Sequence, residues 1–254
     1  MRTLAPAVAI ALVLSACAAG ATQVGSSSSA SATAPARRVL VLTQTRGYHH
    51  ASIPTALSAL TNVARRAGFD VVPLASASQL DAAELRGVAA VVFLLTSGEL
   101  PISPAGKHAL VAYVRGGGGL LGFHSASDTF HHWPAFIRML GAEFDHHALP
   151  STGRLIVEDG KAPATAGLGH SLQMFEELYV FKHDPRASSH ILVRLDTGRG
   201  GPDEPLVWCR REGRGRVFYD ALGHFPQTWS DRRQLRLVSG GLAWAAERGP
   251  GGGC

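Results

Sequence analysis

The stretch GGGGLLGFHSASD, residues 116–128, decides the fold. Four glycines turn the chain into the apolar segment 120–123, which has the character of a buried strand, and polar side chains follow at once with His124. In open parallel sheets, ligands bind outside the carboxyl ends of the strands. The abrupt change from apolar to polar residues therefore predicts that His124 stands at a ligand-binding edge.

Strands alternate with helices on both sides of this stretch. Segment 38–43 (RVLVLT) is a predicted buried strand, and segment 88–95 is almost wholly apolar, as expected of a strand covered on both faces. Ser52 is a predicted cap of a helix that ends before Gly68. Further predicted elements are strands over 69–73, 154–158, 191–195, 205–208 and 216–221, and helices over 104–115 and 231–247. This alternation predicts an α/β fold with a parallel sheet between two layers of helices.

The first residues have the pattern of an export signal. Arg2 precedes an apolar run over residues 4–14, which has signal-peptide length and is too short to span a bilayer. The run ends in LSAC (residues 14–17), which resembles the bacterial lipoprotein processing box and implies that Cys17 is lipidated. An ordinary signal peptide cleaved near residue 18 or 19 is the alternative.

The expected organisation has four parts. These are a lipoprotein signal peptide (1–16), a flexible tether (17–36), one folded domain (37–248) and a Gly-rich tail (249–254). Residues 18–36 are small, polar and uncharged, so they cannot bury enough surface to fold. We expect an exported protein that is lipid-anchored to the cell envelope, facing the periplasm or the outside.

Charge and cysteine content exclude other classes of protein. The formal net charge is +5, but the basic residues are scattered and not interleaved with aromatic residues. We therefore expect no nucleic-acid surface, and a solvated surface is favoured over attraction to anionic lipid. Cys209 and Cys254 can form a disulfide, but we expect Cys209 to be buried as a small apolar side chain and the fold not to depend on disulfides.

Three predicted strands deliver histidine to the same edge of the sheet. His50 follows strand 38–43, His124 follows strand 120–123 and His224 follows strand 216–221. Two more polar clusters contain His147 and Glu177. Histidine with a carboxylate suits proton transfer near neutral pH and also the binding of zinc or a similar divalent cation, and the residue types leave both uses open.

The candidate roles follow from these positions. We expect His124 and His224 to be metal ligands or an acid/base pair, with His147 as a further ligand and Glu177 as a further catalytic group. His50 is expected to contact substrate. Asp128 either orients His124 as a catalytic residue or caps a helix that begins near Thr129.

Seven segments resemble, in the same order, the ThuA-like or trehalose-utilisation proteins. They are GYHHASIP (47–54), VVFL (91–94), the stretch 116–128, Trp133, FDHH (144–147), EELY (176–179) and ALGH (221–224). The likeness covers about residues 38–246. It implies the architecture of the class I glutamine amidotransferases, a flavodoxin-like three-layer sandwich with a mainly parallel sheet.

The chain departs from those amidotransferases at the turn after the central strand. That turn carries a nucleophilic cysteine in the amidotransferases, whereas this chain has FHS (123–125) there, which excludes a thiolate mechanism at this site. Ser125 with a histidine as base is an alternative nucleophile, although the Gly-flanked serine elbow is missing.

The resemblance also implies a substrate class. Association of the family with trehalose and with glucosides oxidised at the 3-position implies a carbohydrate or keto-sugar substrate. The ketone acidifies the neighbouring C–H, so that a base can abstract the proton while a cation or imidazolium holds the enolate. We expect a lyase, isomerase or hydrolase, assisted by a divalent metal such as zinc, and not a glutamine amidotransferase.

The alternative is a non-catalytic sugar-binding lipoprotein, and a homo-oligomer is compatible with either function. Tyr48, Trp133 and Tyr179 either stack on a sugar ring or pack in the core.

Overall fold

The computed structural model describes residues 37–198 and 203–247, together with Met1 and Cys254. The predicted signal peptide, the tether and most of the Gly-rich tail lie outside these residues. One sheet of nine strands runs through the domain in the order β2-β1-β3-β4-β11-β10-β9-β6-β7. No helix in the described part of the chain is long and apolar enough to cross a membrane.

Half of this sheet is parallel and forms the core. It consists of β1 (Arg37–Leu42), β2 (Phe69–Leu74), β3 (Ala90–Leu94), β4 (Gly119–Phe123) and β11 (Gly215–Asp220). Every residue of β3 and β4 is buried, because helices cover both faces of these central strands. The predicted α/β class, with a flavodoxin-like parallel core in a three-layer sandwich, is confirmed.

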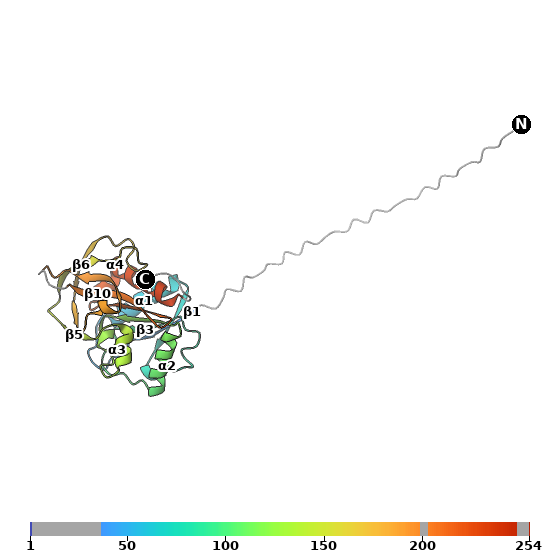
Figure 1. Ribbon diagram of the computed structural model, residues 1–254, viewed down its shortest axis with the longest axis horizontal. Coiled ribbons are helices and arrows are strands. Elements are labelled where there is room, and N and C mark those ends of the chain that lie inside the picture. Colours follow the sequence, from blue (N-terminus) through green and yellow to red (C-terminus); the bar gives the residue numbers. More distant parts are fainter. Residues whose placement is uncertain (2–36, 199–202, 248–253) are drawn as a thin grey trace. The chain divides into compact units, whose positions relative to one another are not determined.

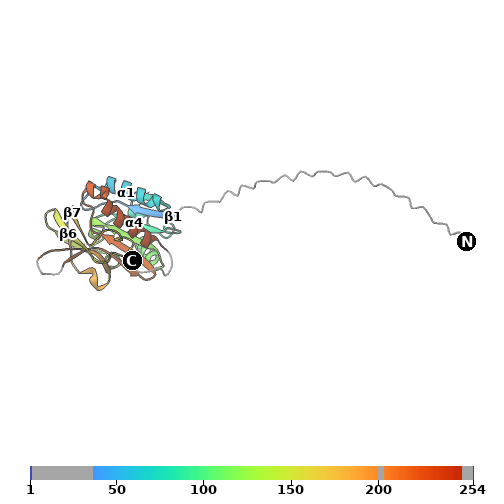
Figure 2. The ribbon, with the colours of Figure 1, turned by 90° about the horizontal axis from the view of Figure 1, so that it is seen from above.

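The helices lie in two layers. On one face, α1 (Ile53–Arg66) packs against α4 (Arg232–Ala246), and on the other face lie α2 (Pro104–Arg115) and α3 (Pro134–Leu140) (Figures 1 and 2). Each of α1, α2 and α4 begins near the carboxyl end of the strand that precedes it. Side chains that follow the strands therefore collect at one edge of the sheet.

The start of α1 differs from the prediction. The Ser52 side chain makes no capping hydrogen bond and instead donates to the carbonyl oxygen of Gly223, at 2.9 Å. Ser52 is the N-cap residue of α1, as predicted, but its hydroxyl bonds a partner distant in sequence and not the backbone of the helix. This bond ties the loop before α1 to the loop after β11.

Beyond β11 the sheet is antiparallel. The strands there are β10 (Glu204–Glu212), β9 (His190–Leu195), β6 (Ser151–Val157) and β7 (Ser171–Glu176). A tight turn joins β10 to β11, and such a turn can connect only antiparallel strands. A separate two-stranded sheet pairs β5 (Phe144–His147) with β8 (Tyr179–Phe181). The patterning did not predict β5, β7 or β8.

Cys209 is buried on β10, as expected, but it is also joined to Cys254 by a disulfide. The expectation of an unpaired cysteine is therefore corrected. Composition could not reveal this pairing, because it depends on the end of the chain returning to within 6.3 Å of Cys209, measured between Cα atoms.

Candidate functional site

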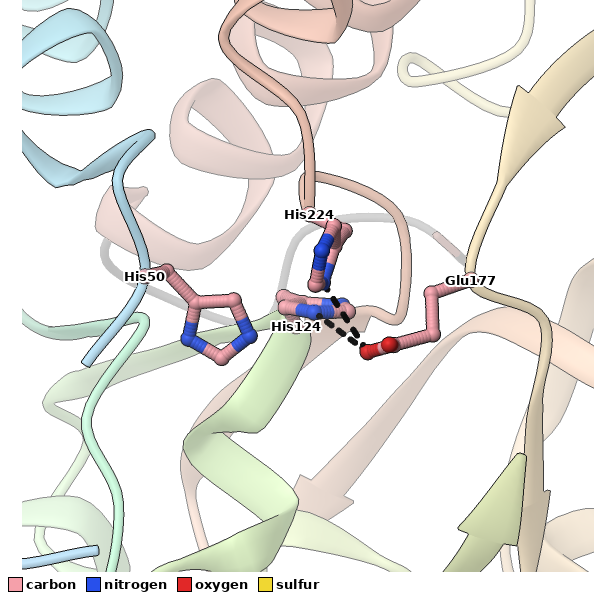
Figure 3. Close-up of side chains that lie close together, drawn as sticks. All are labelled: His50, His124, Glu177 and His224. Atoms are coloured by element: carbon pink, nitrogen blue, oxygen red, sulfur yellow. Dashed lines mark ion pairs between the residues drawn. The ribbon is translucent and has the colours of Figure 1, made fainter. Parts of the chain in front are cut away.

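Four polar side chains meet at the carboxyl edge of the parallel strands (Figure 3). His50 comes from the loop after β1, His124 follows β4, His224 follows β11, and Glu177 lies between β7 and β8. One ring nitrogen of each histidine and one carboxylate oxygen of Glu177 lie within 4.8 Å of one another. We call these four residues the histidine cluster.

Glu177 is the centre of this cluster. Its Oε2 atom lies 3.0 Å from His224 Nδ1 and 3.4 Å from His124 Nε2, the two contacts dashed in Figure 3. Burial alone would raise the pKa of Glu177, but the interactions with His124 and His224 outweigh it and hold this pKa well below its usual range. The cluster therefore contains a fixed negative charge.

His124 occupies a strained turn that aims its ring. Its backbone φ is 49°, in the left-handed region that residues other than glycine seldom adopt. Its Nδ1 atom lies 2.7 Å from the carbonyl oxygen of Ala221, which can only accept, so Nδ1 carries the proton. In the neutral ring, Nε2 then accepts a hydrogen bond from the Tyr179 hydroxyl at 3.1 Å and lies 3.4 Å from Glu177 Oε2. The Tyr219 hydroxyl donates to the His124 carbonyl at 2.6 Å and supports the turn from below.

The imidazoles of His50 and His224 can also offer a ring nitrogen to a ligand. Burial, together with the charges of His124 and His224, lowers the pKa of His50 to about 3, so its ring is neutral at physiological pH. His224 Nδ1 is buried and has Glu177 Oε2 at 3.0 Å as an ion-pair partner, but it makes no hydrogen bond within the described part of the chain. A buried nitrogen without a hydrogen bond costs free energy unless a ligand uses its lone pair.

This donor set fits a divalent cation. Three imidazoles and one carboxylate are ligands that zinc uses in proteins. Metal-ligating histidines commonly donate their second ring N–H to a carbonyl or carboxylate, as His124 does to Ala221. His50, His124, Glu177 and His224 are therefore the residues that would hold such an ion.

Glu176 supports the cluster, and sequence reasoning assigned it no role. Its buried carboxylate accepts the backbone N–H groups of Gly223 and His224, both at 3.2 Å, and the hydroxyl of Thr228. It thereby fixes the loop that carries His224. Alternation along β7 was the available signal, because every second residue up to Glu176 is buried.

His147 and two tyrosines border the cluster. His147 Nε2 lies 3.2 Å from Glu177 Oε1, but His147 is not one of the four clustered donors, in contrast to its predicted place among the metal ligands. Tyr179 is buried, and its hydroxyl lies 3.1 Å from His124 Nε2, so it positions His124 and is closed to a sugar ring. Tyr48 is 62% exposed, and its ring centroid lies 4.6 Å from that of His50.

Two predicted site residues have other partners. The carboxylate of Asp128 lies 3.0 Å from His131 Nε2 and has no described contact with the His124 ring. No helix begins near Thr129, because residues 124–128 form a short 3₁₀ helix and α3 follows only at Pro134. Both interpretations of Asp128 are therefore corrected.

Trp133 belongs to the core. Its ring packs between Phe130 and Phe136, with centroid distances of 5.1 and 5.6 Å. Trp133 therefore packs in the core, which was the alternative to stacking on a sugar ring.

A buried acid below the cluster makes stability depend on pH. Burial raises the pKa of Asp220 to about 7, and the charge of Glu176 acts in the same direction. Because the folded pKa lies above the unfolded value, the stability from Asp220 is complete below about pH 4 and is lost as the pH rises towards 7. Asp220→Asn should therefore raise the free energy of unfolding by about 1–3 kcal/mol at pH 8 and change it little at pH 4.

The side-chain amide that Asp220→Asn introduces would have a hydrogen-bond partner. Gln234 Nε2 donates to Asp220 at 2.8 Å while Gln234 Oε1 has no hydrogen bond, so a flipped Gln234 could accept from Asn. Urea unfolding at both pH values checks this prediction. Equal effects at pH 4 and pH 8 would contradict it.

The fold and cluster together define the class of protein. It is a flavodoxin-like α/β domain with three histidines and a glutamate clustered at the carboxyl edge of its parallel strands. The family model for ThuA, trehalose utilisation, matches residues 38–245, and the chain belongs to this family.

Solved structures agree with this assignment. A ThuA-like protein from Bacteroides uniformis is 22% identical with a TM-score of 0.69, over 84% of this chain and 93% of that chain. One from Parabacteroides merdae is also 22% identical, with a TM-score of 0.65, over 84% and 90% of the two chains. A cytoplasmic protein from Salmonella typhimurium LT2 is 14% identical with a TM-score of 0.59, over 82% and 99%. No curated protein matches the chain. At these identities the structures show the fold alone, and the family implies a role related to trehalose utilisation.

Proposed function

We propose that this protein is a carbohydrate-active enzyme that holds a divalent cation such as zinc at the histidine cluster. Its substrate would be a trehalose-related or other 3-keto glycoside, from which it removes a proton next to the ketone. The observation that carries the proposal is the convergence of four donor atoms within 4.8 Å from four separate segments. The link of the family to trehalose utilisation supports a carbohydrate substrate.

The cluster residues divide the tasks of this reaction. Glu177 balances positive charge, and His50, His124 and His224 supply imidazole nitrogen donors. A bound divalent cation supplies stabilisation of the negative charge that develops on a ketone oxygen when the neighbouring C–H loses its proton.

We assign the removal of the substrate proton to His147. Its Nδ1–H donates to the carbonyl of Ala148 at 2.9 Å, so in the neutral ring Nε2 carries the lone pair. About a third of the side chain is exposed, which allows proton exchange with solvent. The carboxylate of Glu177, 3.2 Å away, would stabilise the imidazolium that forms.

Tyr48 supports a carbohydrate substrate. Its exposed ring lies beside His50 and is nearly parallel to the ring of His224, with 6.2 Å between centroids. An aromatic face in this position could pack against a sugar ring that reaches the cluster.

Ser125 is less suited to act as a nucleophile. Its side chain is buried, and its hydroxyl lies 3.4 Å from His50 Nδ1, longer than the contact an activated serine makes with its base. Proton abstraction is therefore favoured over a serine hydrolase mechanism.

The test is incubation of the full chain with trehalose, 3-ketotrehalose and 3-keto glucosides in D2O, with added zinc, manganese or cobalt and after chelation. We expect deuterium to enter next to the ketone only in the metal-loaded protein, and Ser125→Ala to leave the rate within about threefold. Saturable binding without exchange or product under any metal would favour the sugar-binding alternative. Loss of turnover in Ser125→Ala with indifference to chelators would favour the hydrolase.

We also propose that the chain is exported and lipid-anchored through Cys17, as the LSAC segment (14–17) indicates. Palmitate labelling of cells should depend on Cys17 and disappear in Cys17→Ser. Labelling that persists in the variant would contradict the anchor.

A further inference from the structure

Arginines scattered in the sequence gather at the edge of the sheet opposite the histidine cluster. The five parallel strands begin at this amino edge, and α1 and α2 end there because each helix runs back along the sheet. The Arg37 guanidinium donates to the carbonyl of Ala246, which shows that α4 also ends there. The basic edge, as we call it, consists of the exposed residues Arg37, Arg65, Arg66, Arg86, Arg211 and Arg214.

Most acidic side chains at this edge are paired with other arginines. Glu84 Oε1 lies 2.8 Å from Arg38, Glu212 Oε1 lies 2.8 Å from Arg115, and Glu247 Oε2 lies 3.4 Å from Arg216. Asp70, at the start of β2, is a further acid of this edge. Even with Arg38, Arg115 and Arg216 set against Glu84, Glu212 and Glu247, arginines outnumber acids at this edge, which gives the surface a positive potential.

A hollow lies within the basic edge. It is a cavity of about 690 Å³ whose lining includes Leu85, Val88 and Tyr113, the backbone of glycines 116–118, and Arg211 and Arg214. Apolar walls beside guanidinium groups suit an amphiphile with an anionic head. Guanidinium binds phosphate oxygens in a bidentate manner, and the apolar walls can take the adjoining non-polar part.

We propose that the basic edge docks on a bilayer that contains anionic phospholipid. Charge complementarity carries the proposal, and the place where the described domain begins supports it, because Arg37 lies at this edge. The predicted lipidation site Cys17 precedes Arg37 in the sequence, so its segment is covalently joined to the domain through a residue of the basic edge. The histidine cluster lies at the other ends of the strands, roughly 20 Å away, where it stays open to a water-soluble substrate.

Vesicle sedimentation of matched full-length variants tests the proposal. Arg65, Arg66 and Arg86 are changed together to Gln in one variant, and Arg46, Arg232 and Arg236, exposed near the carboxyl edge, are changed together in the control. Both variants lose three positive charges and keep the same N-terminal segment. Cys17→Ser in every sample removes the lipid, and each sample is mixed with vesicles of pure phosphatidylcholine or with 30% phosphatidylglycerol.

We expect the unsubstituted edge and the control to bind the anionic vesicles better than the neutral ones, and the binding to weaken with salt. The variant at the basic edge should bind the anionic vesicles at least about tenfold more weakly, since each basic residue near such a surface contributes about fivefold. Equal loss in both variants would mean that net charge alone acts, and equal binding to both kinds of vesicle would also overturn the proposal. If duplex DNA binds with the same dependence on these arginines and vesicles do not bind, the partner of the basic edge would be nucleic acid and not a membrane.

Discussion

Replacing Glu177 with Gln should weaken binding of zinc by at least about 100-fold and lower turnover accordingly. The amide keeps the size of the side chain but removes the negative charge that the three imidazoles surround. Loss of a hydrogen-bond partner behind a ligand already costs 10- to 100-fold in affinity, so loss of a ligand should cost no less. Competition with a calibrated chelator measures the affinity.

Glu143 provides the matched control for this change. Its carboxylate contacts His131 at 2.7 Å and Lys182 at 2.6 Å, outside the cluster. Glu143→Gln should therefore bind zinc as tightly as the unsubstituted protein. An equal fall in affinity in both variants would remove Glu177 from the proposed ligand set.

His124→Asn should lower turnover by at least about 1000-fold while the protein stays folded. Asn tolerates the left-handed backbone that His124 adopts, so the change isolates the imidazole better than Ala would. The variant loses the ring nitrogen that would bind the ion. We expect its free energy of unfolding without metal to remain within about 2 kcal/mol of the unsubstituted value.

His131→Asn is the control for this second change. The two ring nitrogens of His131 lie against Asp128 and Glu143, outside the histidine cluster, so turnover should persist. A folded His124→Asn protein that retains turnover would contradict the proposed role of His124. Collapse of the fold would instead identify His124 as a core residue.

The site residues that follow parallel strands could be predicted from the sequence, because the topology of the sheet brings them together. An apolar run followed by a polar residue marks the carboxyl end of a strand, and parallel strands bring those ends to one edge. His50, His124 and His224 could therefore be assigned to one edge of the sheet from the sequence. It could not specify which nitrogen each ring presents, because that depends on bonds such as the one from His124 to Ala221.

The antiparallel half could not be predicted in the same way. Glu177 reaches the cluster because β6 and β7 extend the sheet and β5 pairs with β8. The sequences of these segments have no clear hydrophobic pattern that would predict such pairing. Asp128 and Trp133 follow His124 closely in sequence, yet their side chains contact His131 and Phe130. Proximity along the chain gives no direction for a side chain within an irregular turn.

The distribution of charge over the surface could not be predicted from the sequence either. The arginines of the basic edge are spread from residue 37 to residue 214 and looked like an ordinary solvated surface. The repeated strand–helix order returns the chain to the amino edge several times, and an arginine stands at many of those returns.

The most direct test of the metal centre is an anomalous difference map from crystals grown with zinc, recorded on both sides of the zinc absorption edge. We predict one strong peak within bonding distance of nitrogen atoms of His50, His124 and His224 and of a carboxylate oxygen of Glu177. A map from zinc-saturated crystals without a peak at this cluster, or with its only strong peak elsewhere, would contradict the account.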